Sequence, residues 1–164
     1  MNSLPPPLGD GDLVFWRLDQ ARFAPRWDSG DGSFPAGGRW NLRGTRAVYA
    51  ALDPATAILE VAVHVGFAAL DRVAHVLTSA HVVEPQKARV VLPGDVPEPA
   101  WLRPGLASAG QQAFGSALLA AHEMVLMPSV VSAHSWVMVF DPGRASGLYA
   151  GVMQDAFTLD PRLS

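Results

Sequence analysis

Residues 47–66 read Ala-Val-Tyr-Ala-Ala-Leu-Asp-Pro-Ala-Thr-Ala-Ile-Leu-Glu-Val-Ala-Val-His-Val-Gly, and they carry the clearest structural signal of the chain. Its first five residues form the short apolar run that is typical of a strand. Asp53 is a preferred N-cap and Pro54 suits the first helical position, so we expect a helix over 54–65 that ends at Gly66. The sequence therefore predicts a strand that passes directly into a helix.

The predicted helix is apolar on almost every face, which indicates a helix buried on most sides. Its polar exceptions are Thr56, Glu60 and His64, which are four residues apart and therefore form one stripe. An isolated buried carboxylate is unfavourable, so Glu60 must meet water, a partner or a cleft. Two interpretations stay open: the stripe is the solvated side of the helix, or Glu60 points into a pocket floored by the sheet.

Short apolar runs elsewhere predict further strands and a second helix. We expect strands at 13–18, 47–51, 73–83 (one strand or two), 88–92, 124–127, 129–133, 136–140 and 156–159, and a helix over 108–122. Residues 19–45 show no sustained period and are predicted to form a long loop, as are the proline-rich residues 93–104. Because strands outnumber helices without alternating with them, we predict an α+β fold with a mixed sheet core.

Length and composition bound the class of protein. At 164 residues, 49% hydrophobic and 16% charged, the chain is expected to form a single domain over 12–164 after a flexible, proline-rich tail at 1–11. The absence of cysteine excludes disulfides and thiolate metal sites, and the five histidines show no HxxxH pair, so no metal is expected. No apolar run is long enough for a membrane span and no secretory signal is evident, which favours a cytoplasmic protein away from membranes.

The distribution of charge is more informative than its sum. The chain carries a net charge of −3, yet residues 17–46 contain six arginines against three aspartates, a local excess of +3. Long nucleic acids require a larger basic surface, so direct nucleic-acid binding is not expected. The local cluster suits a small anion such as a phosphate or pyrophosphate, and a solvated arginine surface is the alternative.

Two further segments carry candidate functional residues. Gly37-Gly38-Arg39-Trp40-Asn41 combines glycines that permit close backbone approach with a forked phosphate donor in Arg39, while Trp40 and Asn41 are suited to hold the loop. A tight turn with an anchoring tryptophan is the alternative, because the segment matches neither a Walker loop nor a GxGxxG fingerprint. Ser129 lies between two apolar runs but lacks the GxSxG context of a hydrolase nucleophile, and a turn serine is its alternative interpretation.

Taken in order, these segments resemble the RES domain family, the toxins of bacterial toxin–antitoxin pairs. The matching pieces are Phe15-Trp16-Arg17-Leu18, Gly37-Gly38-Arg39-Trp40-Asn41, Gly44, Ala47-Val48-Tyr49-Ala50, Ala57-Ile58-Leu59-Glu60, His64, Gly115, Pro128-Ser129-Val130-Val131 and Phe157-Thr158-Leu159-Asp160-Pro161-Arg162-Leu163. The resemblance spans roughly residues 13–163. Members often carry asparagines after the Pro-Ser segment, where this chain has residues 133–136 and 140–143 of different sequence.

The resemblance implies a fold like that of the ADP-ribosyltransferase toxins, in which a cleft binds NAD. The implied reaction cleaves the nicotinamide–ribose bond of NAD by hydrolysis or phosphorolysis, with inorganic phosphate as co-substrate in the second case and no cofactor. A protein ADP-ribosyltransferase with a specific target and a catalytically lapsed binding module are the alternatives. The implied partners are a cognate Xre-type antitoxin and a second copy, as a homodimer within the toxin–antitoxin complex.

The resemblance also implies roles for residues of this chain. The catalytic set is Glu60, Tyr49 and Ser129, and the NAD-binding set is Arg17, Arg39, Trp40, Asn41 and Tyr49. Glu60 would stabilise the positive charge that develops on the ribose, and the two arginines would hold the pyrophosphate. Tyr49 would stack on nicotinamide or bond the ribose, and Ser129 would position the ribose or the incoming nucleophile.

Overall fold

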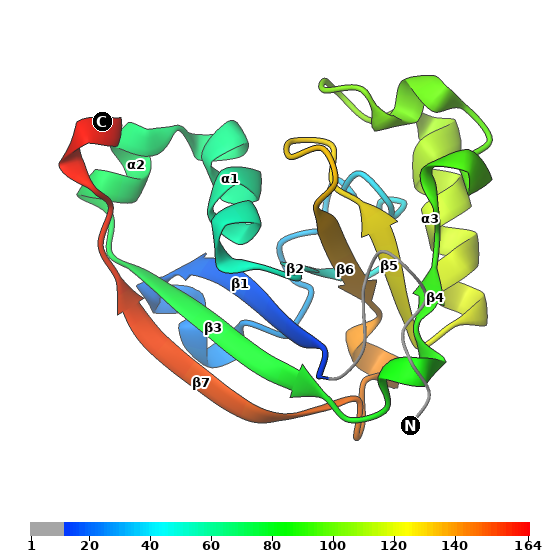
Figure 1. Cartoon of the computed structure of the whole chain (residues 1–164), viewed down its shortest axis with the longest axis horizontal. Coiled ribbons are helices and arrows are strands. Elements are labelled where there is room, and N and C mark those ends of the chain that lie inside the picture. The colour runs from blue at the N-terminus through cyan, green and yellow to red at the C-terminus, as the bar shows by residue number, and fades with distance from the viewer. Residues whose placement is uncertain (1–11) are drawn as a thin grey trace.

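The computed structural model describes residues 12–164, which form one seven-stranded sheet with three α-helices (Figure 1). The strands are β1 (Val14–Gln20), β2 (Val48–Ala51), β3 (His75–Val82), β4 (Arg89–Val90), β5 (Met124–Pro128), β6 (Trp136–Phe140) and β7 (Tyr149–Phe157). The helices are α1 (Pro54–Val65), α2 (Phe67–Arg72) and α3 (Ala109–Ala121). The predicted tail at 1–11 lies outside the described residues.

The sheet is mixed, as the sequence predicts. Its strands follow the order β4-β5-β6-β2-β1-β3-β7, in which the β4–β5 pair is parallel and the other pairs are antiparallel. Short 3-10 turns lie between these elements and after β7, at Ala21–Arg26, Pro85–Lys87, Pro93–Asp95, Pro99–Leu102, Pro142–Arg144 and Pro161–Leu163. The α+β fold with a mixed sheet is therefore confirmed.

The continuous apolar sequences of β5 and β6 follow from the burial of both faces of these strands. Successive side chains of a strand point to opposite faces of a sheet. Even-numbered side chains of both strands pack into one core cluster with Phe15, and odd-numbered ones pack into a second cluster with Trp40 and the helix α3. Because both faces are covered, every residue of β5 and β6 is buried.

The helices α1 and α2 cover the other half of the sheet, over β1 and β3 (Figure 1). A third core cluster joins Ala62 of α1 and Leu70 of α2 to Leu18 of β1. Trp16 lies opposite Ala51, and Ala51 lies opposite Val137, so these three side chains point to one face of the sheet. Val137 belongs to the cluster beneath α3, and Leu18 is two residues after Trp16, so Leu18 points to that same face. All three helices consequently lie on one face, at two separate halves of the sheet.

The caps of α1 match the sequence prediction, and the expected helix over 108–122 is α3, with Ser108 and His122 as its flanking caps. Asp53 accepts a hydrogen bond from the Thr56 amide at 2.8 Å, and Gly66 ends α1 with a φ of 80°. Ser108 caps α3 by accepting from the Gln111 amide at 3.1 Å. The expected burial of α1 on most sides is wrong, because Leu59, Val63 and Val65 are exposed.

Two further sequence predictions are wrong, and one short helix has no counterpart among the predictions. The expected strand at 129–133 is a turn, because serine side chains and main-chain bonds within 129–135 reverse the chain between β5 and β6. The expected strand at 156–159 is only the end of β7, which begins at Tyr149. The segment after Gly66 was not assigned to a helix, yet it forms α2, whose six residues are too few for a helical period to be recognised.

Candidate active site

Glu60 and Ser129 form the centre of the candidate site. Glu60 lies in the middle of α1, and Ser129 is buried directly after the end of β5. The Ser129 hydroxyl donates to Glu60 Oε1 at 3.0 Å. The Ser129 Oγ atom also accepts from the main-chain amide of Ser132 at 3.1 Å. The amide therefore occupies a lone pair of the hydroxyl and leaves its only proton for the carboxylate.

Glu60 and Arg39 influence each other electrostatically. Burial raises the pKa of Glu60, whereas the Ser129 hydrogen bond and the charge of Arg39 act to lower it. Burial likewise lowers the pKa of Arg39, and the charge of Glu60 acts against this shift. The two groups thus carry opposite charges in a common, partly desolvated environment, where each favours the charged form of the other.

Tyr49 holds the glycine-rich loop in place. Its hydroxyl donates to Asn41 Oδ1 at 2.5 Å and accepts from the Trp40 amide at 2.9 Å. A Cβ atom at position 38 would lie 2.6 Å from this hydroxyl, so only glycine fits there. Burial raises the pKa of Tyr49 above its ordinary value, which keeps the phenol protonated as a donor. Tyr49 therefore connects β2 to the loop that carries Arg39.

The structure places the Trp40 and Asn41 side chains in the interior. They are 2% and 0% exposed, and the Asn41 amide nitrogen donates to the carbonyls of Ser33 and Thr45 at 3.3 and 3.0 Å. Their position fits the anchoring role that the loop sequence suggests and leaves Arg39 as the half-buried charged group of the loop. The Arg39 Nη2 atom donates to the Gly105 carbonyl at 2.5 Å.

The helix α3 supports the same loop through residues that the sequence analysis missed. Gln112 donates to the Gly38 carbonyl at 2.8 Å, and the Ser116 hydroxyl accepts from the Leu42 amide at 2.8 Å. Between them, Gly115 allows the main chain of Trp40 to touch the helix, because a Cβ atom there would lie 2.1 Å from the Trp40 carbonyl oxygen. A glycine in the interior of a predicted helix is the sequence signal for this contact.

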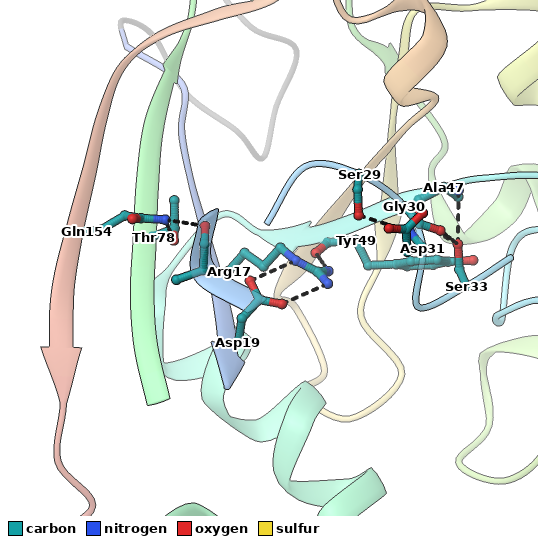
Figure 2. A network of polar contacts seen from close by, with 11 residues as sticks. Arg17, Asp19, Ser29, Gly30, Asp31, Ser33, Ala47, Tyr49, Thr78 and Gln154 are labelled. Carbon is teal, nitrogen blue, oxygen red and sulfur yellow. Dashed lines mark hydrogen bonds and ion pairs between the residues drawn. The ribbon is translucent and has the colours of Figure 1, made fainter. Parts of the chain in front are cut away.

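Arg17 is held by Asp19 and by the main chain of Tyr49. Figure 2 shows its guanidinium bonded to Asp19 and to the main-chain carbonyl of Tyr49. Much of the remaining arginine cluster is also paired within the protein, since Arg26 and Arg46 both form ion pairs with Asp31. The structure therefore brings Glu60, Ser129, Arg39 and Tyr49 together and joins Arg17 to this group through the Tyr49 carbonyl.

Two surface hollows lie away from the Glu60 carboxylate. One of about 340 Å³ is lined by residues that include Leu52, Asp53 and Trp136, and one of about 420 Å³ lies around Arg22 and Val73. Within residues 12–164, no group of three or more His, Asp or Glu side chains could hold a metal ion. No helix of the same residues is long and apolar enough to cross a membrane.

Comparisons with known proteins agree with this architecture. A curated relative named Toxin Res, from Photorhabdus laumondii, is 41% identical over 54 residues, which cover 33% of this chain and 35% of that protein. The match thus spans about a third of the relative's length. A chain in the crystal structure of the M. tuberculosis MbcT–MbcA toxin–antitoxin complex shares the fold, with a TM-score of 0.68 at 20% identity over 90% of this chain and 85% of that one.

This structural match shows that the chain shares its fold with a chain of a toxin–antitoxin complex. The family model of the RES domain matches residues 14–160, which include every strand and every α-helix of the structure. The chain belongs to the RES domain family.

Proposed function

We propose that this chain is the toxin of a toxin–antitoxin pair and that it degrades NAD by cleaving the nicotinamide–ribose bond. The observation that carries the proposal is the hydrogen bond from Ser129 to the partly buried Glu60, whose ionisation is favoured by the charge of Arg39. A carboxylate and a fixed cation in one desolvated environment match the two charges of the substrate, the developing cation at the ribose and the anionic pyrophosphate.

The chemistry follows from the charges. The bond between ribose C1′ and the nicotinamide nitrogen breaks, and its electron pair leaves with nicotinamide, which becomes neutral. Glu60 stabilises the resulting oxocarbenium-like centre, as a carboxylate does in glycoside transfer. An oxygen of water or inorganic phosphate then bonds to C1′, and with water the released proton passes to Glu60, whose raised pKa suits a general base.

The position two residues before Glu60 favours a small acceptor over a protein acceptor. Many ADP-ribosyltransferases that modify proteins have a second acid there, whereas this chain has Ile58. Ile58 packs against the core cluster that contains Ala62 and Leu70, so it contributes to the packing of α1. Hydrolysis or phosphorolysis is therefore our first choice, and transfer to a protein side chain is an outcome of the test below.

The partner follows from the same proposal. The structural relative is part of a toxin–antitoxin complex, and the family resemblance implies an Xre-type antitoxin and a homodimeric toxin within the complex. A free enzyme that consumes NAD arrests growth, so a bound antitoxin would be required to restrain it. We propose that the cytoplasm, where NAD is available, is the site of action.

The test is chromatography of NAD incubated with the purified full chain, with and without inorganic phosphate. We expect release of nicotinamide, together with ADP-ribose in phosphate-free buffer or its phosphorylated form when phosphate is the acceptor. Labelled NAD added to a cell lysate provides a third arm, in which label on protein would indicate ADP-ribosylation. Folded chain, free of antitoxin, that releases no nicotinamide in any arm would overturn the proposal.

A further inference from the structure

The strands β1 and β2 separate soon after they meet. β1 pairs with β3 along all seven of its residues, but among the described residues it pairs with β2 only at Trp16 opposite Ala51. If the ladder continued in the same register, Leu18 would lie opposite Tyr49. Tyr49 therefore has no ladder partner on β1, and a main-chain carbonyl inside a fold requires a hydrogen-bond partner.

Arg17 supplies that partner. Its Nη1 atom donates to the Tyr49 carbonyl at 2.8 Å, across the split between the two strands (Figure 2). The Nε and Nη2 atoms of the same guanidinium meet the two carboxylate oxygens of Asp19 at 3.1 and 3.0 Å. The Asp19 side chain is 10% exposed, and such a two-pronged pair fixes the plane and direction of the guanidinium.

The strand alternation places this pair away from the catalytic groups. Leu18 points toward α1, so its neighbours Arg17 and Asp19 point to the opposite face of β1, together with Phe15. Glu60 lies on α1, on the helical side of the sheet. A pyrophosphate bound beside Arg39 and Glu60 would therefore meet the helical face, and Arg17 touches that side only through the Tyr49 carbonyl.

We propose that Arg17 and Asp19 act as a strap across the split between β1 and β2. They are positioning residues: they fix the position of Tyr49, and Tyr49 in turn positions the reacting end of NAD. The loop that carries Arg39 has independent anchors in Gln112 and Ser116 of α3. Loss of the strap is thus expected to displace Tyr49 while the pyrophosphate-binding arginine stays in place. The inference rests on the proposed NAD chemistry and changes the role that sequence assigns to Arg17.

The kinetic test compares Arg17→Met and Asp19→Asn with Arg22→Met, an exposed arginine near the end of the same strand. Because a misplacement of about 1 Å can cost on the order of 100-fold in rate, we expect both strap variants to lower kcat for NAD by roughly 10- to 100-fold. Affinity for ADP-ribose, measured by calorimetry, should stay within about threefold, because Arg39 holds the pyrophosphate. The Arg22→Met control should resemble wild type in both measurements.

A contact between Arg17 and the pyrophosphate would give a different pattern. Arg17→Met would then weaken ADP-ribose binding tenfold or more, whereas Asp19→Asn would leave it unchanged, since a carboxylate cannot bind the phosphates. That pattern would overturn the proposal that Arg17 and Asp19 act as a strap. Equal kcat in wild type and both variants would overturn it as well.

A second measurement needs no activity and separates this inference from the proposed function. The chain contains two tyrosines, so ring-labelled tyrosine gives two sets of NMR signals, which a Tyr149→Phe variant assigns. We expect Asp19→Asn and Arg17→Met to shift the Tyr49 signals and leave those of Tyr149 in place. Unchanged Tyr49 signals in both variants would refute the strap, even if the chain proves not to consume NAD.

Discussion

At the scale of single residues, the Ser129 hydroxyl has only one direction for its proton. The Ser132 amide occupies one side of the oxygen, and Glu60 accepts on the other. The hydrogen bond favours the ionised form of Glu60 against the burial that raises its pKa. Ser129 therefore increases the fraction of Glu60 that is ionised at a given pH.

This coupling predicts a pH shift in Ser129→Ala. NAD cleavage requires the Glu60 anion, so activity should fall as the pH drops through the pKa of Glu60 in the native protein, which burial places above its ordinary value of 4.5. Removing the hydroxyl raises that pKa further, and the acid limb of kcat/KM should move to higher pH. The measurement is nicotinamide release across a pH series. An acid limb at the same or lower pH in the variant would contradict the role of Ser129.

The same raised pKa predicts a change in stability. Because the native protein holds the Glu60 proton more tightly than the unfolded chain does, this group's stability contribution declines as pH rises through the interval above 4.5. Glu60→Gln removes the ionisation while keeping an oxygen for Ser129. The variant should therefore melt at a higher temperature than wild type at pH 7, with a smaller difference at pH 4. A lower melting temperature at pH 7 would show that the Arg39 attraction outweighs burial.

At the scale of elements, α3 and the loop at 37–44 form one packed unit. The loop lies against the helix at Gly115, and Gln112 and Ser116 bond it on either side. The loop backbone is thus held by a helix that begins about 70 residues later in the sequence. Arg39 depends on α3 for its place, although no residue of α3 reaches Glu60 among the contacts of the structure.

Gly115→Ala tests this packing. Alanine is the better helix former by about 1 kcal/mol, but its Cβ would lie 2.1 Å from the Trp40 carbonyl oxygen, a main-chain atom that cannot move without the loop. Overpacking of this kind costs about 1–3 kcal/mol or more, so the clash outweighs the propensity.

Urea unfolding should show the loss of free energy, and the KM for NAD should rise as Arg39 shifts. The matched control is Gly94→Ala, whose added Cβ meets no atom within 4 Å. A Gly115→Ala protein as stable as the Gly94→Ala control would show that the loop does not depend on this contact.

Local chemistry explains which elements the sequence predicted. The Asp53 cap, Pro54 and Gly66 carry their own conformational preferences, so the bounds of α1 could be predicted directly. The turn at 129–135 could not, because Val130 and Val131 have the composition of a strand and only the serine contacts show otherwise. The exposure of Leu59 and Val63 could not be predicted either, because apolar composition does not reveal which face of a helix meets the sheet.

At the scale of the whole molecule, the sheet joins two halves that carry different parts of the site. The α1 half supplies Glu60, the β5–β6 half supplies Ser129, and β2 between them supplies Tyr49 (Figure 1). The Ser129–Glu60 hydrogen bond connects residues 69 positions apart in the sequence. The site therefore exists only when both halves are folded together.

This arrangement also determines how much of the site the sequence could predict. The residue pattern singles out Glu60, Arg39 and Ser129, the family resemblance adds Tyr49, and the structure brings the four together. The bonds of Arg17 to Asp19 and Tyr49 could not be foreseen, because they depend on the place where β1 leaves β2. The interior position of Trp40 depends likewise on α3, a contact that only Gly115 signals in the sequence.

The most direct test of the account compares nicotinamide release from NAD by wild type, Glu60→Gln and Glu98→Gln, an exposed glutamate in the loop before α3. Each protein is first shown to be folded and free of antitoxin. We expect rapid release by wild type and Glu98→Gln, and a rate reduced by about 100-fold or more for Glu60→Gln, which is the scale of a lost preorganised charge. Equal release by Glu60→Gln and wild type, or none by wild type, would contradict this expectation.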